Sequence, residues 1–201
     1  MNNLALLPRA LGVLYFYSPE HPTFKDVTSD LSFLSHRFAW QDSIMANTFV
    51  TQMQKSLDQL TRYEYSVLFE GQGEMLAPPW GSVYLNKDNI VMGDTTAEFI
   101  KFINKNRIEF NIHNQPLDHF ALMLWTLAAL CEEEIDDNQQ AIIELLKEHL
   151  LPWGYRYLEL LSNNPYSPFY AALAQYSQLC LNGLQQDFGI SDTEIKVRLF
   201  K

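Results

Sequence analysis

Residues 120–131 read FALMLWTLAALC and form the longest apolar run in the chain. Pro116-Leu117-Asp118 comes just before it and predicts a helix start, because proline is tolerated in a first helical turn and an acidic side chain is favoured there. The run has 12 residues, whereas a helix needs about 20 to span a bilayer. We therefore predict a buried helix in a globular core and no transmembrane segment.

Apolar residues keep helical spacing on both sides of this run, as Leu7, Leu11 and Leu14 do near the start. The pattern predicts a first helix that ends before Pro19 and a helical stretch over 42–69 with one break. Further helices are predicted to start at 94 and at Pro152 and to cover 116–133, 142–150 and 167–188. Thr95 and Glu98 have the spacing of a capping box. Without a convincing strand pair, the pattern predicts an all-α fold, a single-domain bundle over residues 1–201 with about eight to ten helices.

The segment Gly71–Gly93 interrupts the helical pattern near the middle of the chain. Its two adjacent prolines, Pro78 and Pro79, cannot lie in a helix, because they lack N–H donors and force extended geometry on the preceding residue. A flexible linker is small and polar, whereas this segment carries Trp80 and Tyr84. We expect an ordered Pro-Pro-Trp loop packed into the domain.

Composition and charge exclude several classes of protein. The chain has 201 residues, 47% of them hydrophobic, and a formal charge of −10. Such a charge repels nucleic acid, which is bound through lysine and arginine. The start of the chain has no cationic region ahead of its apolar residues, so it lacks the pattern of an export signal. We expect a cytoplasmic protein.

The residues that most often hold metals and cofactors show no characteristic spacing. Cys131 and Cys180 are the only cysteines and are predicted to be buried thiols. None of the five histidines has a partner four residues away, the spacing that points two imidazoles at one metal ion. Gly71-Gln72-Gly73 lacks the third glycine of a dinucleotide fingerprint. From the sequence we therefore expect no metal site, no bound cofactor and no enzymatic activity.

Two segments allow more than one interpretation. Trp80 and Tyr84 either anchor a partner or simply fill space in the core. As rigid anchors they would bind at low entropic cost. Asp118 is either an ordinary first-turn residue or, together with His119, part of the rim of a groove. A small hydrolase using His119, Asp118 and Ser82 is a rival interpretation, although no nucleophile elbow is present.

In order, these segments resemble the TorD/DmsD family of chaperones for bacterial molybdenum redox enzymes. The residues that carry the resemblance are 65–71 (YSVLFEG), 78–85 (PPWGSVYL), 93–96 (GDTT) and 115–120 (QPLDHF), with weaker similarity at 151–153 and 168–170. The resemblance covers nearly the whole chain. It departs from the family pattern at Gln115, where an acidic residue is usual, and at Gln72, where proline is usual.

The resemblance implies a monomeric, cytoplasmic, non-catalytic chaperone. It would bind the twin-arginine leader of a molybdoenzyme catalytic subunit and hold it during folding and cofactor loading before Tat export, with the Tat translocase as a further partner. The branch serving dimethyl sulfoxide reductase is the most similar, and a sibling chaperone for trimethylamine N-oxide reductase is the alternative. The implied leader-binding residues are Tyr65, Leu68, Phe69, Pro79, Trp80, Ser82, Tyr84, Asp118, His119 and Phe120.

Such a leader presents two guanidinium groups followed by an apolar stretch, so its receptor needs carboxylates beside an apolar groove. We expect Asp118 to supply a carboxylate, with Glu70 or Glu74 as helpers, and the aromatic residues to supply the groove.

Overall fold

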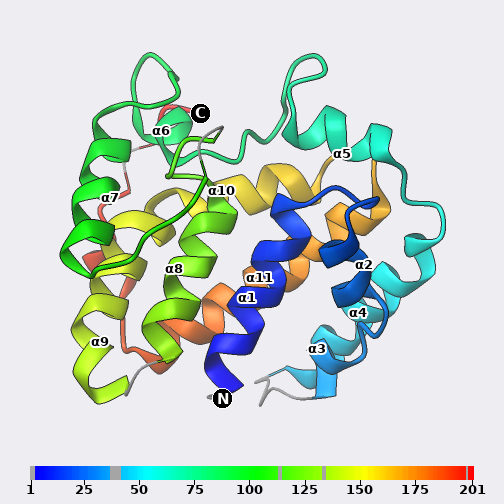
Figure 1. Cartoon of the computed structure of the whole chain (residues 1–201), viewed down its shortest axis with the longest axis horizontal. Helices are drawn as coiled ribbons and strands as arrows, with labels where there is room; N and C mark the ends of the chain where they lie inside the picture. Colours follow the sequence, from blue (N-terminus) through cyan, green and yellow to red (C-terminus); the bar gives the residue numbers. More distant parts are fainter. Residues whose placement is uncertain (1–2, 37–41, 113–114, 133–134, 198) are drawn as a thin grey trace. The chain divides into compact units, whose positions relative to one another are not determined.

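The computed structural model describes residues 3–36, 42–112, 115–132, 135–197 and 199–201. These residues fold into helices and connecting loops (Figure 1), which confirms the all-α prediction. The α-helices are α1 (Asn3–Phe16), α2 (Pro22–Thr28), α3 (Phe33–His36), α4 (Ser43–Leu57), α5 (Arg62–Phe69), α6 (Gly81–Leu85), α7 (Asp94–Lys105), α8 (Phe120–Glu132), α9 (Ile135–Glu144), α10 (Leu151–Ser162) and α11 (Pro168–Asp187). A π-helix, η1 (Leu145–Leu150), joins α9 to α10, and a 3₁₀ turn, η2 (Asp192–Glu194), follows α11.

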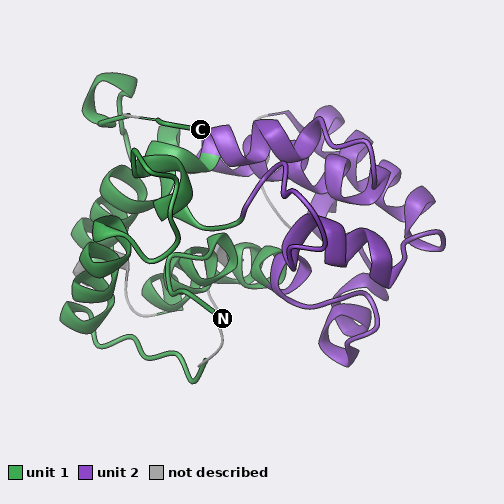
Figure 2. Cartoon of the chain, turned by 90° about the horizontal axis from the view of Figure 1, so that it is seen from above, with its two compact units in different colours: residues 1–12, 79–154, 185–201 green, residues 13–78, 155–184 purple. Residues whose placement is uncertain are grey.

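The described chain divides into two compact units (Figure 2). Unit 1 contains residues 1–12, 79–154 and 185–201, and unit 2 contains 13–78 and 155–184. The chain passes from one unit to the other within α1, α10 and α11, and also between Pro78 and Pro79. The single domain over residues 1–201 stays a prediction.

The core of unit 1 surrounds α8, the helix predicted from the longest apolar run. Ten of its side chains are buried, which agrees with a helix that is apolar on nearly every face. Trp125, on its less buried side, donates its indole N–H to the Arg9 carbonyl at 3.1 Å. A Cβ at Gly12 would lie only 2.2 Å from the Trp125 Nε1, so α1 can approach α8 here because residue 12 is glycine.

The core of unit 2 is rich in aromatic residues, and the hydroxyls of two of its tyrosines form hydrogen bonds to residues far away in the sequence. Tyr15 shares a 2.8 Å hydrogen bond with Ser177, and Tyr176 donates to the Leu34 carbonyl at 2.8 Å. Cys180 is buried nearby on α11, and burial raises the pKa of its thiol to about 12. Burial also raises the pKa of Cys131 in unit 1, to about 11. Both cysteines are buried thiols, as predicted.

The structure corrects one predicted cap and the starts of two predicted helices, because α8 begins at Phe120 and not at Pro116, and α9 begins at Ile135 and not at Ile142. The cap of α7 is Gly93, with no side-chain hydrogen bond, so Thr95 lies inside the helix and the predicted capping box does not form. The helix predicted from Pro152 is α10, which begins one residue earlier, at Leu151, and follows η1 without a break. Proline has no N–H to donate, and the wider π turn lets the helical path continue to it.

A capping box forms instead at α5, where Thr61 Oγ1 accepts the Glu64 N–H and Glu64 accepts the Thr61 N–H at 2.7 Å. We expect Thr61→Ala to lower the free energy of unfolding by about 1 kcal/mol, the usual contribution of such a cap. Urea denaturation checks this. Thr95→Ala is the matched control, because the Thr95 hydroxyl has no partner among the described residues; equal losses in both variants would contradict the assignment of the cap.

No helix in the described part of the chain combines the length and hydropathy that a membrane crossing requires.

Candidate functional site

Backbone hydrogen bonds join two of the motif segments, 78–85 and 115–120, within unit 1. Trp80 and His119 form an antiparallel bridge, the only such pairing in the described residues. The Phe120 N–H donates to the Pro79 carbonyl at 2.8 Å, and the Gly81 N–H donates to the Asp118 carbonyl at 3.1 Å. Residues separated in the sequence are thereby fixed side by side, and the Pro-Pro-Trp loop is ordered as predicted.

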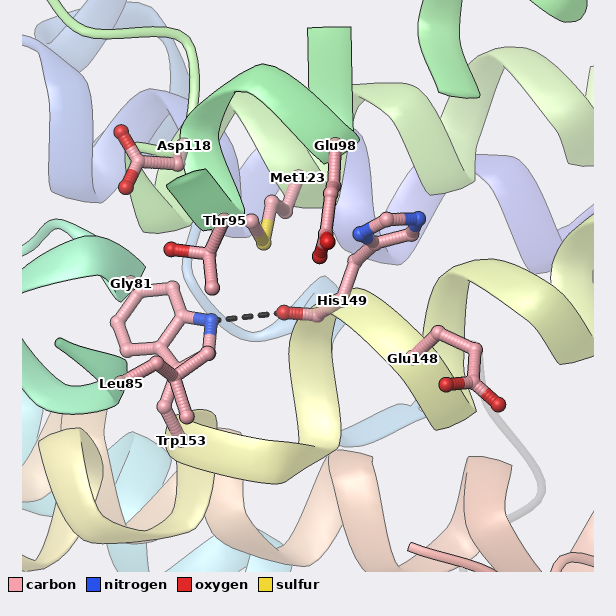
Figure 3. Close-up of a pocket in the computed structure, with 9 residues that line it drawn as sticks. All are labelled: Gly81, Leu85, Thr95, Glu98, Asp118, Met123, Glu148, His149 and Trp153. Carbon is pink, nitrogen blue, oxygen red and sulfur yellow. Dashed lines mark hydrogen bonds between the residues drawn. The ribbon is translucent and has the colours of Figure 1, made fainter. Parts of the chain in front are cut away.

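Asp118 holds the start of α6. Its Oδ2 accepts the Ser82 N–H at 2.7 Å, and its side chain is buried, with 1% of the residue exposed. Its Oδ1 has no hydrogen-bond partner among the described residues. Asp118 and Thr95 line a small cavity together with Gly81 and Trp153 (Figure 3), with room for about one water molecule. In this structure Asp118 therefore positions the loop.

His119 is also buried, and its Nδ1 accepts the Ala121 N–H at 3.1 Å. That bond requires an unprotonated Nδ1, so the neutral ring carries its hydrogen on Nε2. Burial lowers the pKa of His119 to about 3. The ring meets Trp80 edge to face, with centroids 6.1 Å apart. His119 thus supports Trp80 as a neutral packing residue.

The same contacts disfavour the hydrolase interpretation. A catalytic carboxylate would orient the histidine, and the histidine would accept the serine proton. Here Asp118 accepts the Ser82 backbone N–H, and His119 Nδ1 accepts a backbone N–H from Ala121. The Ser82 hydroxyl accepts the Met92 N–H at 3.2 Å. These contacts serve the backbone and do not form a proton relay.

The buried histidine predicts a pH dependence of stability. The unfolded ring titrates near pH 6.5, whereas the folded ring titrates near pH 3. Between these values only the unfolded state binds the proton, so stability is lost as the pH falls through this window, by up to about 1.4 kcal/mol per pH unit. Urea denaturation between pH 7 and pH 5 should show a shallower dependence for His119→Gln, which cannot titrate. Parallel curves for the two proteins would refute a buried neutral His119.

Trp80 is the one predicted leader-contacting residue that is only half-buried. Its indole N–H donates to Gln115 Oε1 at 3.3 Å. Gln115 stands where the family usually has an acidic residue, and the amide still provides an acceptor for Trp80. The ring is therefore held from two sides, by Gln115 and by His119.

Ser82, Tyr84 and Phe120 are buried in unit 1. Tyr84 stacks on Trp153 with centroids 5.4 Å apart, and Phe120 meets the same indole edge to face at 5.9 Å. For Tyr84 the structure favours the interpretation that it fills space in the core. Trp153 is the centre of this aromatic cluster, and the sequence analysis did not identify it. Its position beside Pro152 does not indicate that rings from other elements pack around it.

Tyr65, Leu68 and Phe69 lie on α5 in unit 2 and are buried. Tyr65 donates its hydroxyl to the Phe16 carbonyl, and Phe69 meets Tyr170 with ring centroids 4.8 Å apart. These three residues belong to a different unit from the other seven. A single groove formed by all ten stays a prediction.

Glu70, expected to help bind a guanidinium group, already pairs with Arg62 at 2.6 Å. Hydrogen bonding to Arg62 is the main cause that lowers the pKa of the Glu70 carboxyl. Glu74 is exposed. A leader guanidinium group would therefore compete with Arg62 for the Glu70 carboxylate.

Nine of the ten predicted leader-binding residues are buried, and only Trp80 reaches the surface to any extent. Direct contact by the nine stays a prediction that requires a conformational change. Their visible role is to fix Trp80 and the loop that follows it. Within the described ranges, no three His, Cys, Asp or Glu side chains are grouped so that they could hold a metal ion.

The comparisons with known proteins agree with the motif assignment. Residues 39–159 match the family model described as nitrate reductase delta subunit. The chain is 32% identical over 186 residues to the Tat proofreading chaperone DmsD of Salmonella typhimurium, covering 90% of this chain and 88% of that protein. The chain belongs to the TorD/DmsD family.

Two further relatives show how broad the similarity within the TorD/DmsD family is. The probable Tat proofreading chaperone DmsD of Haemophilus influenzae is 30% identical over 195 residues, 95% of this chain and 94% of that protein. The chaperone protein TorD of Actinobacillus pleuropneumoniae serotype 3 is 29% identical over 150 residues, 69% of this chain and 71% of that protein. The names of these relatives indicate chaperones.

Proposed function

We propose that this protein is a cytoplasmic chaperone that binds the twin-arginine leader of a molybdenum-containing reductase. The first candidate for this client is the catalytic subunit of dimethyl sulfoxide reductase. The chaperone holds the leader while the enzyme folds and receives its cofactor before Tat export. The observation that carries this proposal is the pairing of the two motif segments, which presents Trp80 on a fixed loop. The names of the DmsD relatives support the same function.

The proposed contact uses the preorganisation of the loop. A bound leader loses conformational freedom, which costs about 2–5 kcal/mol or more, so a receptor gains when its own surface is already ordered. Trp80 meets this condition because Gln115 and His119 hold its ring before any ligand arrives. Burial of the leader's apolar stretch on this ring should provide most of the affinity.

The cationic end of the leader needs acceptors that are still accessible. Asp118 is buried and Glu70 is paired, whereas Asp94 and Glu98 are exposed on α7 in the same unit as Trp80. We assign the guanidinium contacts to this acidic part of α7. In this proposal the protein performs no catalysis, acts as a monomer and passes the leader to the Tat translocase.

Calorimetry with a synthetic twin-arginine leader tests the function directly, with micromolar or tighter binding expected. Replacing both leader arginines with lysine should weaken binding about fivefold to tenfold, because an ammonium group cannot make the bidentate contact of a guanidinium group with a carboxylate. Equal affinity for the two peptides would remove the guanidinium contacts from the proposal. A leader that does not bind at all would overturn the function.

The match to TorD of Actinobacillus pleuropneumoniae favours a second client. The alternative is a chaperone for a different molybdoenzyme, such as trimethylamine N-oxide reductase. Identifying the polypeptide that co-purifies with the chain under anaerobic growth separates the two clients.

A further inference from the structure

The last seven residues differ in charge from the rest of the chain. Residues 195–201, IKVRLFK, contain three cationic and four apolar side chains and no acidic one, in a protein whose net charge is −10. This segment, here called the tail, therefore has the same general chemistry as the proposed ligand, which combines cations with an apolar stretch.

The structure fixes the start of the tail within unit 1. A capping box of Ser191 and Glu194 closes the η2 turn. Gln185 donates to Asp192 at 2.7 Å, and Lys147 pairs with Glu194 at 3.5 Å. The tail therefore leaves η2 from a defined position.

The other end of the tail contacts the motif segment 78–85. The Phe200 N–H donates to the Tyr84 carbonyl at 2.8 Å. Tyr84 lies in the last turn of α6, where the carbonyl groups have no partner within the helix. Figure 1 shows the C-terminus beside α6. The tail thus provides a backbone donor to the segment that carries Trp80.

An open cavity of about 680 Å³ lies beside this contact and is lined by residues of the 85–97 segment and by Phe200. Its volume lies within the usual range of ligand sites, about 300–1,000 Å³. Ile90 and Met92 line it and are 49% and 71% exposed. Asp88 and Asp94 also line it and are exposed, and together they outnumber the exposed cation Lys87 in the same lining. Exposed apolar groups beside carboxylates complement a peptide that is both apolar and basic.

We propose that the 85–97 surface binds the leader as an extended peptide, and that the tail, through Phe200, occupies the edge of this surface in the free protein until the leader displaces it. The inference rests on the proposed function. Main-chain hydrogen bonds, with side chains placed in an adjacent pocket, are a common way to hold an extended peptide. Val197, Leu199 and Phe200 stay 56%, 37% and 40% exposed. The tail therefore buries little of its apolar surface, and a leader can displace it at low cost.

Phe200→Pro tests the occupancy in the 201-residue chain, because proline removes the N–H that the Tyr84 carbonyl accepts. A tail that covers the surface nine-tenths of the time lowers the apparent leader affinity about tenfold, so we expect Phe200→Pro to bind the leader about tenfold tighter than wild type. Gln140→Ala changes an exposed side chain of α9, outside the tail, and should stay within about twofold of wild type. Equal or weaker leader binding by Phe200→Pro would overturn the occupancy.

Hydrogen exchange separates this inference from the proposed function. We expect the Phe200 amide to exchange slowly in the free protein and to lose its protection when the leader saturates the chain. An unprotected amide in the free protein overturns the inference without any ligand. Leader binding that leaves the protection unchanged also overturns it, but the proposed function stands. If neither wild type nor Phe200→Pro binds the leader, both are overturned.

Discussion

Trp80→Ala is expected to weaken leader binding at least tenfold, which corresponds to about 1.4 kcal/mol. Trp80 is the only half-buried member of the ten predicted binding residues, and tryptophan is enriched among the residues that dominate binding interfaces. Its ring is fixed by Gln115 and by the neutral His119, so contact with the leader requires little further ordering. Calorimetry with the synthetic leader measures the loss.

Trp125→Ala is the matched control for this prediction. Trp125 is also partly buried in unit 1, and its indole N–H likewise has an oxygen acceptor, the Arg9 carbonyl. Its removal should leave leader affinity within about twofold of wild type, as expected away from an interface. A similar loss in both variants would show that the Trp80 effect reflects general destabilisation, and an unchanged Trp80→Ala would remove Trp80 from the binding surface.

Gly81→Ala is expected to lower the free energy of unfolding by about 1–3 kcal/mol, the usual effect of overpacking a core. A Cβ at residue 81 would lie 2.7 Å from Nε1 of Trp153 and 2.9 Å from its Cε2. The indole cannot move aside, because Tyr84 and Phe120 pack against it and its N–H donates to the His149 carbonyl at 2.8 Å. Because Gly81 follows Trp80 directly, leader binding should weaken as well.

Gly183→Ala provides a control with the opposite sign. Gly183 lies within α11, and a Cβ there would meet no atom within 4 Å. Alanine in a helix interior is favoured over glycine by about 0.5–1 kcal/mol, so this variant should be more stable than wild type. Urea denaturation of the two variants checks both signs. A Gly81→Ala protein as stable as wild type would mean that the Trp153 cluster is looser than described.

Local sequence patterns predicted the parts of the fold that depend on neighbouring residues. The apolar run at 120–131 became α8, and the broken pattern at 42–69 became α4 and α5. The cap of α7 was misplaced, because the chain is already extended at Gly93 and the helix starts at Asp94. The pattern of residues 145–150 predicted a helix but not its π form.

The roles of the site residues depend on contacts between distant segments, which the sequence does not specify. Tyr84 could be assigned to the core only after the structure placed Trp153 against it. Asp118 was predicted to lie in a first helical turn, but α8 begins only at Phe120, and the partner of Asp118, the Ser82 N–H, belongs to another motif. The cationic tail was readable in the sequence, whereas its contact with Tyr84 was not.

Photo-crosslinking tests most directly the claim that the leader binds at the Trp80 loop and the 85–97 surface. A leader peptide with benzophenone in its apolar stretch is irradiated with the 201-residue chain, and the modified fragments are identified by mass spectrometry. The account predicts cross-links to residues 78–97, lost when unlabelled leader is added in excess. Cross-links that are likewise lost on adding unlabelled leader, but that are confined to α4 or α11, would contradict it.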